Sequence, residues 1–141
     1  MGNTNFGPNG RPSGGGERGG STVIRAIHQA LDTLDADRIR DLTEGVSGAQ
    51  ALRDPGPIFR RIQKELTDDQ TLDRLLKMWR VLDVLSQTSI GTERRLSTSA
   101  QRCVIVLQQR DPSSAVAVAN QALERGLALA PQTILATVSK G

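Results

Sequence analysis

The sequence predicts an all-α protein: a compact bundle of five to six helices behind a disordered, glycine-rich N-terminal tail. Aromatic residues make up only 2% of the 141 residues and tyrosine is absent, so the core must be aliphatic, which suits packed helices better than a small sheet. Apolar residues recur at steps of three and four through most of the chain, which is the spacing of one helix face. Short breaks rich in proline and glycine separate these segments, and we find no convincing hairpin signal.

The first twenty residues differ in composition from the rest of the chain. "MGNTNFGPNGRPSGGGERGG" holds most of the glycines and two of the six prolines, and it offers almost nothing to bury. Glycine maximises the backbone entropy that folding must overcome. We therefore expect residues 1–20 to form a disordered tail and residues 21–141 to form a single helical domain.

The first part of this domain predicts one helix with a short continuation. The apolar stripe over 23–34 indicates a helix that begins after Ser21 or Thr22. We expect Asp35 to cap a short continuation that ends at Gly45, and "SGAQALRD" can add a further turn or two.

The middle of the chain predicts two longer helices. Pro57 is well placed as the first residue of the helix "PIFRRIQKELT", since its missing amide hydrogen is not needed there. Asp68 is the expected cap of the longest helix, over about 69–88, whose stripe of leucines is widened by Met78 and Val81.

Two more helices and a short terminal one follow. The stretch "TERRLSTSAQRCVIVLQQRDP", residues 92–112, has a polar start and an apolar middle, and predicts a helix starting between 93 and 100. Asp111 and Pro112 open the next helix. Its alanine-rich run "AVAVANQALERGLALA" predicts a second central helix, and "QTILATVS" after Pro131 can form a short terminal one.

The composition argues against several classes of chemistry. With one cysteine and one histidine, no zinc, iron or haem site is expected, and no internal disulfide can form. Cys103 lies in an apolar run, where a buried thiol stays inert, so pairing with His28 as nucleophile and base is disfavoured. We predict no enzyme activity and no cofactor. Without a signal peptide or a long apolar segment, we expect no secretion, no membrane span, and a cytoplasmic or nuclear location.

Basic side chains from two helices are the candidate contacts for a partner. If the two helices lie side by side, these residues share one surface that can contact an acidic protein or RNA phosphates. They are Arg60, Arg61, Lys64, Arg94, Arg95 and Arg102. Because the folded part offers few aromatic stacking platforms, RNA contacts should be mostly to phosphates and sensitive to salt.

Ser97 is a candidate phosphorylation site. "RRLS" places Arg94 and Arg95 three and two residues before Ser97, and this spacing resembles the substrate motif of basophilic protein kinases of the cyclic-AMP-dependent class. A phosphate at a helix start is favoured by the helix dipole and by neighbouring arginines. The alternative is that Ser97, Thr98 and Ser99 are only capping hydroxyls.

Two further features have both a structural and a functional interpretation. Trp79, the only tryptophan, lies on a leucine stripe and is either a core residue or an interface anchor. Carboxylates on the first helical region form either a solvated face or an acidic patch for a basic partner. They are Asp32, Asp35, Asp37, Asp41 and Glu44.

These observations together predict a protein that acts by binding. The first hypothesis is a non-enzymatic helical protein-interaction or assembly module that self-associates and is regulated by phosphorylation. The second is an RNA- or nucleoprotein-associated factor, of the kind that small viruses encode, using the arginine-rich surface.

Overall fold

The computed structural model describes residues 15–140, and within this range all the regular elements are helices, which confirms the predicted all-α fold. Residues 1–14 and 141 lie outside the described part of the chain. The helices are α1 (Gly15–Thr33), α2 (Ala36–Thr43), α3 (Gly45–Ala51), α4 (Gly56–Glu65), α5 (Leu72–Ser86), α6 (Arg94–Arg110), α7 (Pro112–Glu124) and α8 (Pro131–Lys140).

The described helices number eight rather than five or six, because short elements that the sequence left open all form. The break between α1 and α2 falls at Leu34, which adopts a φ of 53°. Asp35 then caps α2 as predicted, accepting a hydrogen bond from the Arg38 amide at 3.1 Å. Gly45, with a φ of 78°, is the first residue of α3 and directly follows the break after α2. A left-handed φ at each break ends one helix and redirects the chain.

The N-terminal boundary of the helical region also differs from the expectation. Helix α1 begins at Gly15, six residues before the predicted start of the domain, so residues 15–20 of the expected tail are helical. Four of these six residues are glycines, which are poor helix formers. The remainder of the predicted tail, residues 1–14, is outside the described residues.

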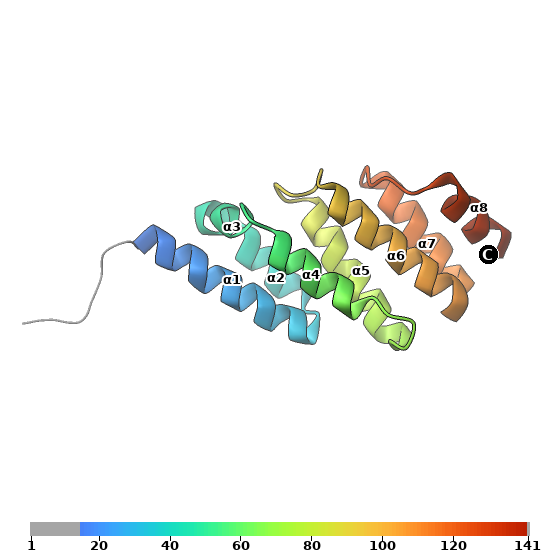
Figure 1. Ribbon diagram of the computed structural model, residues 1–141, viewed down its shortest axis with the longest axis horizontal. Coiled ribbons are helices and arrows are strands. Elements are labelled where there is room, and N and C mark those ends of the chain that lie inside the picture. The colour runs from blue at the N-terminus through green and yellow to red at the C-terminus, as the bar shows by residue number, and fades with distance from the viewer. Residues whose placement is uncertain (1–14, 141) are drawn as a thin grey trace, which may run out of the picture.

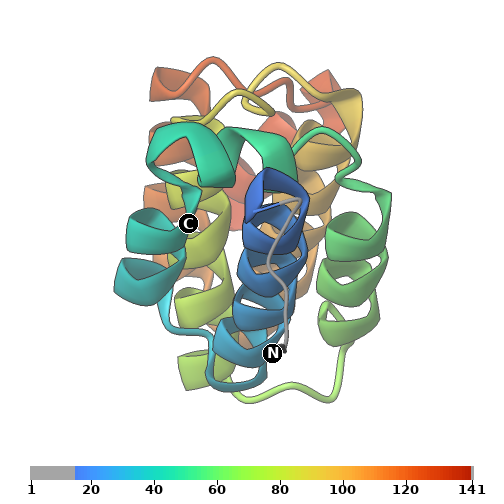
Figure 2. The same cartoon turned by 90° about the vertical axis from the view of Figure 1, so that its left-hand side faces the viewer.

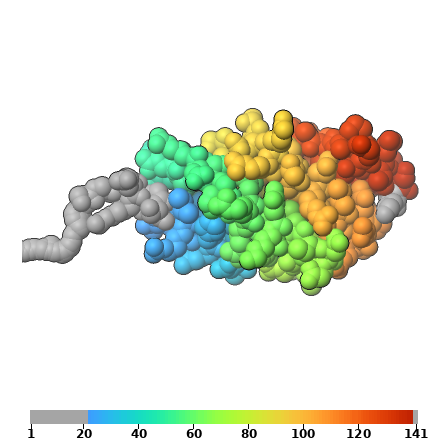
Figure 3. Space-filling view, viewed as in Figure 1, coloured from blue at the N-terminus to red at the C-terminus, as the bar shows by residue number. Residues whose placement is uncertain are grey.

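The bundle is elongated, and its helices follow one another along the long axis in chain order, except that α3 turns back beside α1 (Figure 1). Helices α1–α3 occupy one end and α7–α8 the other, and the space-filling view shows the same gradient along the molecule (Figure 3). Seen from the α1 end, α2 and α4 lie on opposite sides of α1 (Figure 2), and both pack against it. Helix α6 is the centre of the fold, because it packs against α4, α5, α7 and α8.

The core is aliphatic, as the composition predicts. Helix α6 contributes Leu96, Ala100, Cys103, Val104 and Leu107, none of which has any exposed surface. Helix α7 packs against α6, and its buried positions are only alanine and valine. Small residues such as these allow helix axes to approach closely.

One helix start differs from the sequence prediction, and a second lies within the predicted range but has no side-chain cap. Helix α5 begins after Thr71, whose hydroxyl accepts a hydrogen bond from the Arg74 amide at 3.2 Å, whereas Asp68 lies in the preceding loop. Helix α6 follows Glu93, whose side chain makes no capping hydrogen bond. Within the described residues, no helix is long and apolar enough to cross a membrane.

Candidate interaction surfaces

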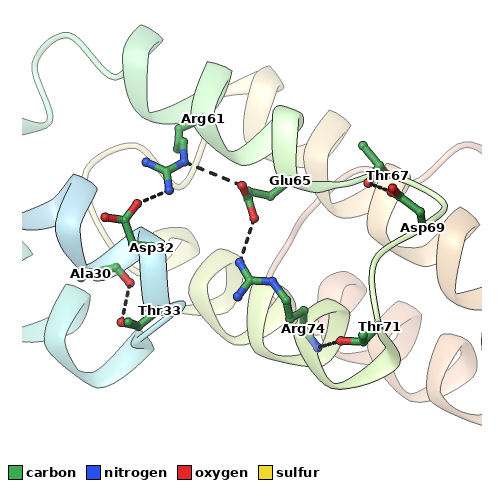
Figure 4. Close-up of polar contacts among 9 residues, drawn as sticks. All are labelled: Ala30, Asp32, Thr33, Arg61, Glu65, Thr67, Asp69, Thr71 and Arg74. Atoms are coloured by element: carbon green, nitrogen blue, oxygen red, sulfur yellow. Dashed lines mark hydrogen bonds and ion pairs between the residues drawn. The ribbon is translucent and has the colours of Figure 1, made fainter.

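Arg61, one of the six predicted contact residues, is used within the chain. Its guanidinium group donates to Asp32 of α1, and it lies 3.9 Å from Glu65 on its own helix. Glu65 also accepts a hydrogen bond from Arg74 of α5 at 2.8 Å. Figure 4 shows this chain of charges, which links α1, α4 and α5. Both Arg61 and the candidate acidic residue Asp32 are therefore neutralised locally.

Arg102 holds the loop between α4 and α5. Its Nε donates to the Leu66 carbonyl at 3.3 Å, and its Nη2 lies 3.5 Å from the Asp68 carboxylate. About two turns further along α6, Arg110 donates a hydrogen bond to the Asp68 main-chain carbonyl. Both arginines are hydrogen-bonded to this loop, so their guanidinium groups are partly occupied by contacts within the chain.

Arg60 and Arg95 converge from two helices on one point. Helix α4 packs against α6, and an Nη1 atom of each arginine lies within 3.5 Å of the position that a Cβ on Gly56 would occupy. The Arg95 guanidinium stacks over the Phe59 ring, 5.1 Å from its centroid, and lies 3.0 Å from Glu93. The Asp54 carboxylate also borders this point. The structure thus brings one predicted arginine from each helix together.

Lys64 and Arg94 complete the predicted set, and both are exposed. Like Arg60, they make no ion pair within 4.0 Å among the residues that the structure describes. The six predicted residues therefore fall into two groups. Arg61, Arg95 and Arg102 have carboxylate partners within the chain, whereas Arg60, Lys64 and Arg94 present their charge to solvent.

Trp79 is 4% exposed, and its indole Nε1 donates to Gln121 Oε1 of α7 at 2.5 Å. It lines a hollow of about 430 Å³ between α5 and α7, together with Leu76, Arg80 and Val118. The indole therefore joins α5 to α7 inside the chain.

Ser97 lies inside α6 and does not cap it. Its Oγ accepts a hydrogen bond at 2.9 Å from the backbone amide of Ala128, in the connection between α7 and α8. The neighbouring hydroxyls bond only to their own helix: Thr98 donates to the Arg94 carbonyl and Ser99 to the Arg95 carbonyl. The interpretation of all three as capping hydroxyls is therefore wrong, because the uncapped Glu93 precedes the helix.

Apolar side chains are exposed on α8, a feature the sequence analysis missed. Leu135 and Val138 are 67% and 66% exposed and lie three residues apart on one side of the helix. The terminal region is also poor in charge, since residues 112–139 contain only Glu124 and Arg125 as charged side chains, and Arg125 pairs with Asp83 at 2.6 Å. The scarcity of charge was the sequence signal that could have indicated an exposed apolar surface here. We call Leu135 and Val138 the α8 face.

The two side chains with the most reactive chemistry, Cys103 and His28, lie on different helices. Cys103 is buried in α6, where its thiol donates to the Leu75 carbonyl at 3.7 Å and burial raises its pKa to about 12. His28 lies on α1, which is not among the helices packed against α6. Among the described residues, no group of three or more potential metal-ligating side chains is close enough to hold an ion.

The candidate acidic patch on the first helices is divided in the same way. Asp32 pairs with Arg61, Asp35 caps α2, and Asp37 pairs with Arg40 at 3.3 Å. Asp41 and Glu44 are exposed. Three of these carboxylates therefore make ion pairs or a helix cap within the chain, and the other two lie on a solvated surface.

The fold and these surfaces define a small all-helical chain whose exposed features are a basic cluster around Gly56 and an apolar face on α8. Comparison of the sequence and the structure with protein-family models, curated proteins and solved structures finds no match in any of the three.

Proposed function

We propose that this chain is a non-enzymatic assembly module that self-associates through the α8 face. The observation that carries the proposal is the exposure of Leu135 and Val138 at the end of the bundle. Helix α8 has ten residues and packs against α6 and α7. It leaves two large aliphatic side chains in solvent, and this exposed apolar surface can be buried against a partner.

A second copy of the chain is the occupant that the charge distribution favours. The whole chain carries a net charge of +3, so contact between most surfaces of two copies brings like charges together. The α8 face has no charged neighbour within 131–139, and interface cores are depleted in charge. A two-fold contact places the same patch on both copies, so this uncharged face is complementary to itself.

The strength of such a contact follows from the exposed area. Burying two-thirds of a Leu or Val side chain contributes roughly 1–2 kcal/mol, so four side chains give on the order of 4–8 kcal/mol. The loss of translational and rotational freedom offsets much of this. We therefore expect a weak dimer whose population depends on protein concentration.

Sedimentation equilibrium of the full chain, from micromolar to near-millimolar concentration, tests the proposal. The wild-type chain should shift from monomer to dimer, and Leu135→Glu should remain a monomer with an unchanged helical circular dichroism spectrum. Gln63→Glu makes a similar change in net charge at an exposed position of α4 and should behave like the wild type. A wild-type chain that stays monomeric throughout, or a Leu135→Glu variant that dimerises as well, would refute it.

A second candidate function is binding to single-stranded RNA, and the convergence of Arg60 and Arg95 on Gly56 favours it. Two guanidinium groups next to the exposed Lys64 and Arg94 can contact neighbouring phosphates. Fluorescence anisotropy with a labelled RNA, repeated over a range of salt, should show a logarithmic salt slope that flattens by about 1.4 in Arg60→Gln/Arg95→Gln. Arg61→Gln/Arg102→Gln removes the same charge and is the matched control, since these two arginines contact Asp32 and Asp68. No measurable binding by the wild type would exclude this function.

A further inference from the structure

Two polar side chains of α6 hold the connection between α7 and α8. Ser97 Oγ accepts a hydrogen bond from the Ala128 amide at 2.9 Å, and Gln101 Oε1 accepts one from the Ala130 amide at 2.6 Å. Ser97 and Gln101 are one helical turn apart, so they lie on the same side of α6. This pair satisfies two main-chain donors of a segment that has no regular structure between Arg125 and Ala130.

The same connection determines where α8 lies. Leu127 and Leu129 are buried within it, and α8 follows directly and packs on α6 and α7. Further along α6, Gln108 Nε2 donates to the Thr133 carbonyl at 3.3 Å and to Thr137 Oγ1 at 2.6 Å. We call Ser97, Gln101 and Gln108 the polar seam. Ser97 is at the N-terminal end of this seam.

Ser97 is also the hydroxyl in the "RRLS" motif, and the local structure favours access to it. Arg94 and Arg95 are exposed, and Ser97 is partly exposed. The first turn of α6 lacks a side-chain cap at Glu93, and uncapped first turns open most readily. Opening this turn breaks the bond between Ser97 and Ala128, together with the stacking of Arg95 on Phe59 and the burial of Leu96.

We infer that Ser97 is a phosphorylation site for a basophilic protein kinase, and that its phosphorylation releases the connection between α7 and α8. In this reaction Ser97 Oγ forms a bond to the γ-phosphorus of ATP, the bond from that phosphorus to the leaving ADP oxygen breaks, and the hydroxyl proton passes to the kinase base. The Ala128 nitrogen lies 2.9 Å from Ser97 Oγ, so a phosphoryl group bonded to this oxygen crowds the connection and competes with its hydrogen bond. Arg94 and Arg95 attract the new charge toward the start of α6.

The functional consequence rests on the proposed self-association. Once Ala128 is released, α8 keeps its contacts through Gln101 and Gln108, but the connection before it is held less firmly. Two copies must then order a looser connection to present matching faces, which costs conformational entropy. Phosphorylation is therefore expected to weaken the dimer.

The modification itself is tested by incubating the full chain with the catalytic subunit of a cyclic-AMP-dependent kinase and ATP, followed by mass spectrometry. Incorporation of phosphate should map to Ser97, persist in Thr98→Ala, and be lost in Ser97→Ala. It should fall strongly in Arg94→Gln/Arg95→Gln. Absence of phosphate at Ser97 in the wild type would overturn the assignment of the site.

The structural effect is tested by amide hydrogen exchange of the Ala128 region in dilute, monomeric protein. The phosphorylated chain and Ser97→Asp should exchange about two- to tenfold faster there, as expected for one lost hydrogen bond. Ser97→Thr keeps the hydroxyl acceptor and should exchange like the wild type. Thr98→Asp puts the same charge one residue away, on a side chain that bonds only to its own helix, and should have little effect.

The outcomes separate this inference from the proposed function. Equal acceleration by Ser97→Asp and Thr98→Asp, or full protection in the phosphorylated chain, would overturn the release of the connection. Faster exchange with an unchanged dimer population would overturn the link to assembly. If the wild type is a monomer at every concentration, self-association fails, while the exchange measurement still decides the effect of Ser97.

Discussion

A buried polar cluster fastens α8 to α6, and its energetics can be tested by a double-mutant cycle. Gln108 is 8% exposed and Thr137 is 2% exposed. Gln108 Nε2 donates to Thr137 Oγ1 at 2.6 Å, and Thr137 Oγ1 donates in turn to the Thr133 carbonyl at 2.7 Å. Each side chain therefore provides a hydrogen-bond partner for the other at a site that is nearly closed to water.

The cycle uses Gln108→Leu and Thr137→Val, which remove the polar atoms with little change in size. Each single substitution removes the bond between Gln108 and Thr137 and leaves the remaining side chain with only its bond to the Thr133 carbonyl, so each should lower the free energy of unfolding by about 1–2 kcal/mol. In the double variant both polar partners are gone, and the face becomes apolar. The combined loss should be smaller than the sum of the single losses by about 1 kcal/mol.

Urea unfolding followed by circular dichroism at low protein concentration measures all four free energies. The slope of the free energy with urea should be the same in each variant, which shows that the same surface is exposed on unfolding. Losses that add to within about 0.5 kcal/mol would show that the two side chains are not coupled. The assigned contact between α6 and α8 would then be wrong.

Two other predictions concern the core. Leu82→Ala should cost on the order of 2–5 kcal/mol, because Leu82 has no exposed surface, whereas Leu123, at 44% exposure, should cost about 1 kcal/mol or less. Urea unfolding of both variants checks this, and equal losses would contradict the burial. The Cys103 thiol should resist thiol reagents in the native protein, because burial raises its pKa from 9.0 to about 12. Above pH 9 the unfolded state loses this proton first, so stability should fall between pH 9 and about 12, and Cys103→Ala should show a flatter dependence.

Much of the fold follows from local sequence signals. Asp35 caps α2 because its carboxylate reaches the Arg38 amide, and Pro112 opens α7 because the first helical residue needs no amide hydrogen. These signals act over one turn of helix, so the sequence alone reveals them. The prediction was wrong at the start of α5, because Asp68 and Thr71 are both residue types that can cap a helix and the structure uses Thr71.

The candidate site depended on contacts that are distant in sequence. The sequence singled out Arg60, Arg61, Arg95 and Ser97 from residue type and spacing, but it could not distinguish their roles. Asp32 and Arg61 are 29 residues apart, and Ser97 and Ala128 are 31 residues apart. Only the packing of the helices decides which arginine has a carboxylate beside it and which hydroxyl bonds to another segment.

The sequence by itself determined an aliphatic all-helical chain, because the helical repeat, the caps and the lack of aromatic residues are all local or compositional properties. It did not determine which apolar residues are left outside the core. Leu123, Leu135 and Val138 have the same character as the leucines and valines of α5 and α6, but they lie at the end of the bundle, where no further helix of the described chain covers them. Burial is a property of the packed arrangement, so only the tertiary structure could reveal the α8 face.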